Sequence, residues 1–322
     1  MSHESIRAVD YTTEKGAEKK LLIIPTDNPL RDIIKPPEGP RVYRERLGAE
    51  ISGKAIDDIF FYRQDPQEAE FEHSEFDHLK MGGLWTIGHH YTKQAIEMAQ
   101  HGHDFATFVP NFNYPVLRPL YDSQLRKSPY IWHAKNGLQV AKAVLRHTGK
   151  DKLRISGHSY AGHTVTHLVS HKPKLFESVV LEDPSGPTTH DVKPVELVQK
   201  ELLPALQIMG EDLHMLPPNT KERSIRRITD HGIHAGRELI GLKTIRPDFR
   251  KNLKEMRDAG VPVGLLLLSR SAIFNAVHMR AVAERENMFD LIDEVDEYHI
   301  APNIRPASVN ETERDMFDQL AA

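Results

Sequence analysis

Residues 134–186 alternate between helix-like and strand-like patterns, and this alternation constrains the fold more than any other feature of the chain. Apolar residues recur at helical spacing up to a glycine stop at Gly149, and a strand-like segment (residues 152–156) follows. A second helical face ends at Pro173, and residues 178–182 (SVVLE) form another strand pattern. Strands that alternate with helices are typical of a largely parallel sheet covered on both faces. The sequence therefore predicts an α/β fold.

Residues 157–162 (GHSYAG) stand between a strand pattern and a helix pattern. A serine in a sharp strand-to-helix turn projects its hydroxyl out of the sheet, where a base can reach it. Such a turn is strained and its flanks nearly touch, so small residues are needed two positions before and after the serine. Gly157 and Ala161 meet that need. The motif makes Ser159 a candidate nucleophile and the N–H of Tyr160 a candidate donor to an oxyanion.

Weaker patterns extend the predicted sheet in both directions. Strands are expected at residues 20–24, 56–62, 83–87, 104–109, 261–268 and 293–300. Further helices are expected at residues 92–100, 272–288 and 309–320. The first 80 residues give the least clear signals, because five prolines between Pro25 and Pro40 indicate irregular chain.

Composition excludes several classes of function. A net charge of −4 and a pI near 6.6 argue against a nucleic-acid partner, since no basic excess exists to neutralise phosphates. The absence of cysteine excludes disulfides, thiolate metal sites and cysteine nucleophiles. The longest apolar run, residues 261–268, is too short to span a bilayer. The first residues (MSHESIRAVD) lack the basic and apolar regions of a signal peptide, so we expect a cytoplasmic protein with no membrane partner.

From residue 82 to its C-terminus the chain resembles the α/β-hydrolase superfamily. The best-matching stretch, residues 134–186, has helix, strand, serine turn, helix and strand in the order of that family. The resemblance implies a mostly parallel central sheet flanked by helices, with a helical lid inserted before the penultimate strand. It divides the chain into N-terminal strands and an irregular region packed on the core (residues 1–80), the core itself (residues 81–186 and 259–322) and the lid (residues 187–258).

The resemblance also implies roles for two residues of a catalytic triad. Ser159 lies at the position of the nucleophile. The family places its histidine after the last strand, several residues before a proline that opens the closing helix. His299, followed by Pro306, fits this pattern. His299 would then deprotonate Ser159 and later protonate the leaving group.

The acid of the expected triad departs from the usual pattern. Most members carry Asp or Glu in the turn after the penultimate strand, but residues 269–275 (SRSAIFN) contain no carboxylate. Ser271 is at roughly the expected place, and a serine can orient an imidazole without stabilising imidazolium by charge. In a minority of the superfamily, including pancreatic-type lipases, the acid follows the preceding strand. Asp183 in LEDPSGP has that position, so we expect Asp183 to be the acid and keep Ser271 as the alternative.

A second oxyanion donor is expected in the loop before the helix at residues 92–100. Gly88 and His89 are the favoured candidates, and residues 25–28, after the first strand pattern, are the rival. The candidate residues of the substrate pocket are Trp85 and His90 in this loop, Tyr114 in the aromatic region after it, and His158 in the serine motif.

His163, His167 and His171 share one helix face at i, i+4 spacing, a pattern that can chelate a metal. No H-E-x-x-H arrangement accompanies them, and the stripe of this helix that faces the sheet is apolar. We therefore interpret the three histidines as a partly exposed polar face. No metal and no cofactor is expected.

These features predict a serine hydrolase that cleaves an ester-type bond (carboxylic ester, lactone, thioester or amide) of a small-molecule substrate through an acyl-enzyme. Two alternatives stay open. One is a non-hydrolytic or C–C bond-cleaving enzyme on the same fold. The other is a catalytically inactive ligand-binding member, which the missing carboxylate in residues 269–275 suggests. A homodimer is a candidate assembly.

Overall fold

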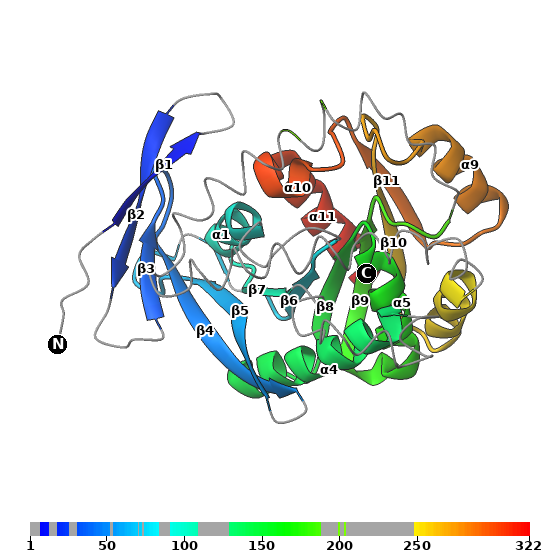
Figure 1. Cartoon of the computed structure of the whole chain (residues 1–322), viewed down its shortest axis with the longest axis horizontal. Helices are drawn as coiled ribbons and strands as arrows, with labels where there is room; N and C mark the ends of the chain where they lie inside the picture. The colour runs from blue at the N-terminus through cyan, green and yellow to red at the C-terminus, as the bar shows by residue number, and fades with distance from the viewer. Residues whose placement is uncertain are drawn as a thin grey trace.

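The computed structural model of the 322-residue chain shows one eleven-stranded sheet with helices on both of its faces (Figure 1). The residues that the structure describes are 7–12, 18–25, 31–51, 54–69, 71–72, 74–83, 91–108, 129–187, 199, 203 and 248–322. All structural statements below concern these residues.

Half of the sheet is parallel. Its strands are β6 (Asp77–Met81), β7 (Phe105–Phe108), β8 (Leu153–His158), β9 (Phe176–Glu182), β10 (Val263–Leu268) and β11 (Leu291–Val295). They lie in the order β7-β6-β8-β9-β10-β11, and each neighbouring pair runs parallel. Because the carboxyl ends of parallel strands lie at one edge of a sheet, the residues that follow β6, β8 and β9 meet there. The predicted α/β fold class is confirmed.

The other half of the sheet is antiparallel and comes from the first 64 residues. Its strands are β1 (Arg7–Thr12), β2 (Glu18–Pro25), β3 (Arg31–Lys35), β4 (Val42–Ile51) and β5 (Lys54–Gln64), and β5 joins it to β7. The irregular chain expected between Pro25 and Pro40 is wrong for β3, which contains no proline and pairs with both β2 and β4. Across β3 and β4, the guanidinium of Arg44 donates to Asp32 Oδ2 at 2.6 Å.

Helices form two layers, one on each face of the sheet (Figure 1). Their bounds are α1 (Thr92–Gln100), α4 (Pro129–Thr148), α5 (Ala161–His171), α9 (Ala276–Arg285), α10 (Ala301–Ile304) and α11 (Pro306–Ala321). Strand β10 shows why both faces are covered: Leu265 and Leu267 belong to the core shared with α4, α5 and α9, whereas Leu266 and Leu268 pack with α11. Among the described residues, no helix combines the length and apolar character that crossing a bilayer requires.

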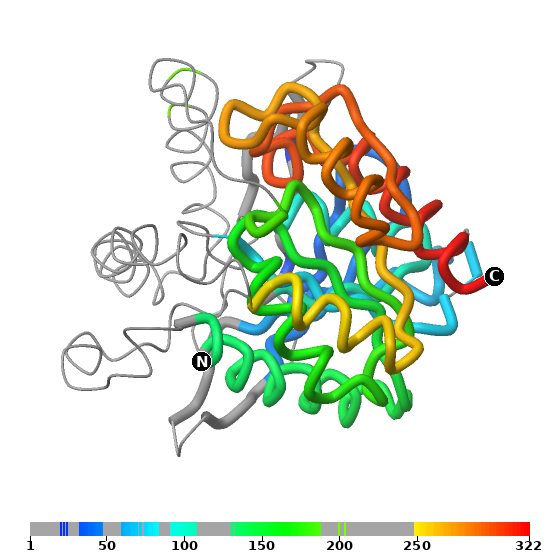
Figure 2. The backbone as a smooth tube through the Cα atoms, turned by 90° about the vertical axis from the view of Figure 1, so that its right-hand side faces the viewer, coloured from blue at the N-terminus to red at the C-terminus, as the bar shows by residue number. Residues whose placement is uncertain are grey.

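Residues 248–258 form a helix that packs on the core, although the sequence assigns them to the lid. Phe249, Leu253 and Met256 are buried in the same core as α4 and α5. Figure 2 shows this helix, in yellow, beside α5, and the ring of Phe249 lies edge-on against that of His163 on α5 at 5.3 Å. The remainder of the predicted lid, apart from residues 187, 199 and 203, lies outside the described residues.

Strand β6 is an element that was not expected from the sequence. It spans Asp77–Met81 and Gly83 lies beyond its end, whereas a strand was expected at residues 83–87, of which residues 84–87 lie outside the described residues. Every residue of β6 is buried, including the polar Asp77, His78 and Lys80. Buried charge within a strand departs from the apolar pattern by which interior strands are identified, and this explains why β6 was not predicted. The chain therefore leaves the carboxyl edge of the sheet near Gly83.

Candidate active site

Ser159 occupies the sharp turn between β8 and α5. Its φ is +58°, in the left-handed region that residues other than glycine seldom adopt. Gly157 is required two residues earlier, because a Cβ there would lie 2.8 Å from Cγ2 of Val165 and 3.2 Å from the carbonyl carbon of Ala161. The strand, strained turn and helix have the geometry of a nucleophile elbow.

Backbone hydrogen bonds tie this turn to the end of β9. The N–H of Ser159 donates to the carbonyl of Glu182 at 3.0 Å, and the N–H of Ser185 donates to the carbonyl of Ser159 at 3.1 Å. The residues that follow β8 and β9 are thus held side by side at the carboxyl edge of the sheet. Asp183, the residue between these two anchors, is adjacent to the turn.

The structure brings His299 and Asp183 together. His299 Nδ1 lies 2.6 Å from Asp183 Oδ2, and both side chains are buried. Because a carboxylate only accepts hydrogen bonds, Nδ1 carries the proton and the lone pair of the neutral ring is on Nε2. Asp183 has a φ of +39° and is fixed by its own N–H, which donates to the carbonyl of Leu266 at 2.8 Å. This is the arrangement in which a carboxylate orients a histidine that acts as a base.

Ser271, the alternative third member, is engaged elsewhere. Its hydroxyl oxygen accepts from the N–H groups of Ile273, at 3.3 Å, and Phe274, at 3.1 Å. It therefore stabilises the turn that follows β10. The ring of Phe274 in turn packs against that of His299, with centroids 5.4 Å apart.

The loop after β6 passes directly against Ser159. A Cβ on Gly83 would lie 2.9 Å from Cβ of Ser159 and 3.5 Å from its Oγ, so only glycine permits this approach. The N–H of Gly83 donates to the hydroxyl of Tyr91 at 3.1 Å. Gly83 was not expected at the site, because the sequence pattern placed it inside the strand expected at residues 83–87.

A buried cluster of charges lies beneath the site, on the face of the sheet that α1 and α11 cover. Lys80 on β6 contacts Glu182 on β9, and its Nζ lies 3.8 Å from Oε1 of Glu313 on α11. Glu313 also accepts from Gln94 at 3.0 Å, and His78 lies 3.3 Å from it. Burial raises the pKa of Glu182 to about 8; Glu313 adds to this rise and Lys80 opposes it. One cation between two carboxyls thus leaves the cluster holding a proton near neutral pH.

The raised pKa of Glu182 gives stability a particular dependence on pH. A carboxyl whose pKa is higher in the folded than in the unfolded protein contributes stability at low pH that is lost as the pH rises. In the wild type, Glu182 should make the free energy of unfolding fall between about pH 5 and pH 8, with a slope of up to about 1.4 kcal/mol per pH unit. We expect Glu182→Gln to lack this fall. Urea unfolding at several pH values would measure this slope. Glu294→Gln, at a half-exposed ion pair with Arg280, should keep the wild-type slope; an unchanged slope in Glu182→Gln would contradict the prediction.

The other predicted site residues divide into two groups. Trp85, Gly88, His89, His90 and Tyr114 lie outside the described residues, as do residues 26–28 of the rival oxyanion loop. Tyr160 directly follows Ser159, precedes the first residue of α5 and is buried. His158 is buried, and both of its ring nitrogens lie within hydrogen-bond distance of other protein groups, so it does not offer them to a substrate.

The three histidines of α5 differ from one another in their surroundings. His163 is buried against Tyr130, Tyr160 and Phe249, so the expected polar face is wrong at this position. His167 is half-buried and His171 is exposed. Among the described residues, no group of three or more His, Cys, Asp or Glu side chains is arranged to hold a metal ion.

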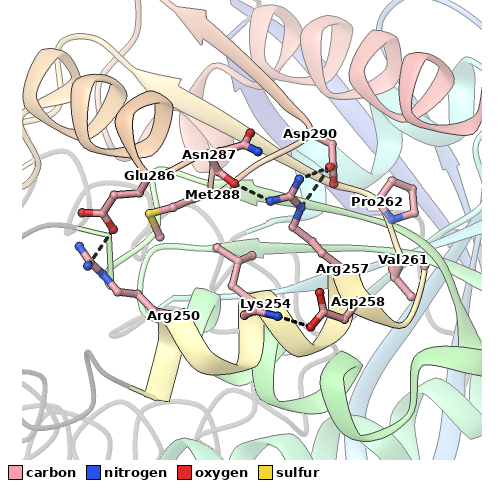
Figure 3. A pocket seen from close by; sticks show the side chains of 12 residues that line it. Arg250, Lys254, Arg257, Asp258, Val261, Pro262, Glu286, Asn287, Met288 and Asp290 are labelled. Carbon is pink, nitrogen blue, oxygen red and sulfur yellow. Dashed lines mark hydrogen bonds and ion pairs between the residues drawn. The ribbon is translucent and has the colours of Figure 1, made fainter.

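A cavity of about 750 Å³ lies at the opposite edge of the sheet. Pro262 and Asp290 in its wall precede β10 and β11, whereas Ser159 follows the parallel strand β8. Figure 3 shows that its cations are paired, Arg250 with Glu286, Lys254 with Asp258 and Arg257 with Asp290. This cavity is therefore separate from the Ser159 site.

No family model matches the chain, and no curated protein matches its sequence. Its structure is similar to that of a bacterial membrane phospholipase A (14% identity, 86% of each chain covered, TM-score 0.54). A serine hydrolase from Cycloclasticus zankles (12% identity, 86% of this chain and 99% of that chain, TM-score 0.53) is also similar. An esterase from Thermogutta terrifontis is similar as well (14% identity, 87% of this chain and 99% of that chain covered, TM-score 0.51). With the strand order and the elbow after β8, these likenesses confirm the α/β-hydrolase fold that the sequence predicts.

Proposed function

We propose that this α/β-hydrolase-fold chain is a serine hydrolase that cleaves an ester-type bond of a small-molecule substrate through an acyl-enzyme. The observation that carries the proposal is the contact of 2.6 Å between His299 Nδ1 and Asp183 Oδ2, at the edge of the sheet where the strained Ser159 turn lies. Neighbours of the same fold that are described as an esterase, a serine hydrolase and a phospholipase support the same reaction class.

In this mechanism Ser159 Oγ attacks the acyl carbonyl while His299 Nε2 accepts its proton. Asp183 keeps the proton of the neutral ring on Nδ1 and balances the charge of the imidazolium that forms. His299 then protonates the leaving group, which departs and leaves the acyl group on Ser159. A water molecule, deprotonated by the same nitrogen, hydrolyses this acyl-enzyme and restores the serine.

The oxyanion of the tetrahedral intermediate needs donors that are in place before the reaction. The N–H of Tyr160 is the first proposed donor, because Tyr160 follows the nucleophile and its peptide lies at the positive N-terminal end of α5. The loop that starts beside Ser159 at Gly83 would supply the second. Gly88 and His89 remain the proposed donors. Of the lid expected at residues 187–258, we keep residues 187–247 as the proposal, because residues 248–258 pack on the core.

Two other functions were open from the sequence. The inactive ligand-binding alternative rested on the missing carboxylate after β10, and the contact between Asp183 and His299 removes that reason. A non-hydrolytic enzyme on the same fold would use the same residues, with Ser159 acting partly as a base. Detection of an acyl-enzyme by mass spectrometry after a slow ester would separate the two, because only the hydrolase forms that adduct.

A fluorophosphonate probe tests the proposal directly. We expect the folded protein to be labelled at Ser159, located by peptide mapping, because the probe reacts with a serine that a neighbouring base activates. Ser159→Ala should not be labelled, and Ser170→Ala, at a serine on α5 away from the turn, should be labelled like the wild type. Folded wild-type protein that resists the probe would overturn the hydrolase assignment.

A further inference from the structure

Tyr91 and His158 form a hydrogen-bonded pair beside the proposed nucleophile. The hydroxyl of Tyr91 lies 2.9 Å from His158 Nδ1, and His158 Nε2 lies 2.7 Å from the backbone carbonyl of His299. The Gly83 N–H reaches the same Tyr91 hydroxyl at 3.1 Å. All of these groups are buried, so water does not compete for the bonds.

The chemistry of the groups fixes the direction of each bond. A backbone carbonyl only accepts, so His158 Nε2 carries a proton and donates to His299. Burial holds the pKa of His158 well below its usual range, with His299 and Lys80 adding to the effect, so the ring is neutral. Its Nδ1 is then an acceptor, and the Tyr91 hydroxyl donates to it while accepting from Gly83. A series of hydrogen bonds therefore runs from Gly83 through Tyr91 and His158 to the carbonyl of His299, and each bond has one donor and one acceptor.

This series of hydrogen bonds joins three segments that are far apart in sequence. His158 is the last residue of β8 and immediately precedes Ser159. His299 lies between β11 and α10, and its ring packs against the ring of His158, with the centroids 4.5 Å apart and the planes tilted by 35°. Gly83 belongs to the loop that touches Ser159. Two side chains thus connect the proposed nucleophile, the proposed base and the loop that borders them.

We propose that Tyr91 and His158 are positioning residues that set His299 and Gly83 relative to Ser159. This inference rests on the proposed serine hydrolase function. Neither side chain takes part in the reaction. Their effect is on geometry, to which the rate of a proton transfer and of an attack on a carbonyl is highly sensitive.

Tyr91→Phe removes one hydroxyl and keeps the ring. With p-nitrophenyl butyrate as the probe substrate, we expect kcat to fall by about 10- to 100-fold while KM changes little, because a misplacement of about 1 Å costs about that much in rate. His158→Leu, which cannot donate to the His299 carbonyl, should lower kcat further. His158→Gln should recover part of the loss, because its amide N–H can reach the same carbonyl.

Tyr62→Phe is the matched control. Tyr62 is equally buried, and its hydroxyl lies 3.2 Å from that of Thr92, the residue after Tyr91, so the same group is lost at the same end of α1 without touching the pair. We expect Tyr62→Phe and Tyr91→Phe to lower Tm to a similar degree, and only Tyr91→Phe to lower kcat. If the two variants have equal kcat, or if His158→Gln is no better than His158→Leu, the positioning role is wrong.

A measurement that needs no turnover separates this inference from the proposed function. The His299 Nδ1–H proton bonded to Asp183 can be followed by proton NMR. We expect its exchange with water to be faster in Tyr91→Phe and His158→Leu than in wild type or Tyr62→Phe. A wild type that shows neither activity nor fluorophosphonate labelling would overturn the hydrolase proposal. The exchange rates would still decide whether Tyr91 and His158 position His299. Equal exchange rates in all four proteins would overturn the positioning role.

Discussion

Asp183→Asn is expected to lower kcat toward a short-chain ester by about 10⁴-fold with little change in KM. An asparagine beside His299 Nδ1 preserves the shape of the site but presents an amide that can donate, which favours the tautomer with its proton on Nε2. That nitrogen could then no longer accept the proton of Ser159. The neutral amide would also leave the imidazolium without the charge that stabilises it. Steady-state kinetics with p-nitrophenyl butyrate would measure both parameters.

Ser271→Ala is the natural comparison for this variant. Because the Ser271 hydroxyl accepts from two backbone N–H groups after β10, its loss should affect stability more than turnover and leave kcat within a few-fold of wild type. The opposite ranking, a severe loss in Ser271→Ala with a mild one in Asp183→Asn, would show that the acid has been assigned to the wrong residue.

Lys80→Met is expected to lower the free energy of unfolding by about 3–5 kcal/mol at pH 7. Lys80 is fully buried between the carboxyls of Glu182 and Glu313, and its removal leaves both without a cation. Lys80 opposes the rise in the pKa of Glu182, so in the variant this carboxyl should stay protonated over a wider pH range, and the loss should become smaller as the pH falls. Since Glu182 immediately precedes Asp183, the strand end that carries the proposed acid should loosen as well. Chemical denaturation at several pH values measures the effect.

Lys254→Met provides the control for this prediction. Lys254 forms an ion pair with Asp258 on an exposed helix face, so its loss should cost less than about 1 kcal/mol and should not depend on the charges of the core. A Lys80→Met variant as stable as Lys254→Met would mean that the buried cluster contributes no net stability.

The elements with regular apolar patterns could be predicted from the sequence. The helix expected at residues 92–100 coincides with α1, and the strand expected at residues 261–268 contains β10. The elements with buried polar residues could not. In β6, His78 and Lys80 share one face with Ser156 of the adjacent β8 and Glu182 of β9, the next strand beyond it, and only these tertiary partners make their burial favourable. The available signal was the alternation of His78 and Lys80 with Leu79 and Met81.

The same distinction holds for the candidate site. Ser159 could be singled out from the motif together with the strand and helix patterns that flank it, because the strain of its turn and the need for Gly157 arise from contacts within this short segment. The partner of His299 lies 116 residues away, and the sequence left Asp183 and Ser271 open. The order of β9 and β10 in the sheet brings one carboxylate to the imidazole, whereas the Ser271 hydroxyl is directed to its own turn.

The sequence by itself determined the fold class, the strained serine turn and the candidate histidine, because the spacing of residues and the sterics of the backbone depend on residues that are close together along the chain. The tertiary structure alone decided which carboxylate meets His299, where the loop beside Ser159 begins, and how Tyr91, His158 and the Lys80 cluster are connected. These features depend on burial and on distances between strands and helices far apart in sequence, which are set only when the sheet has assembled.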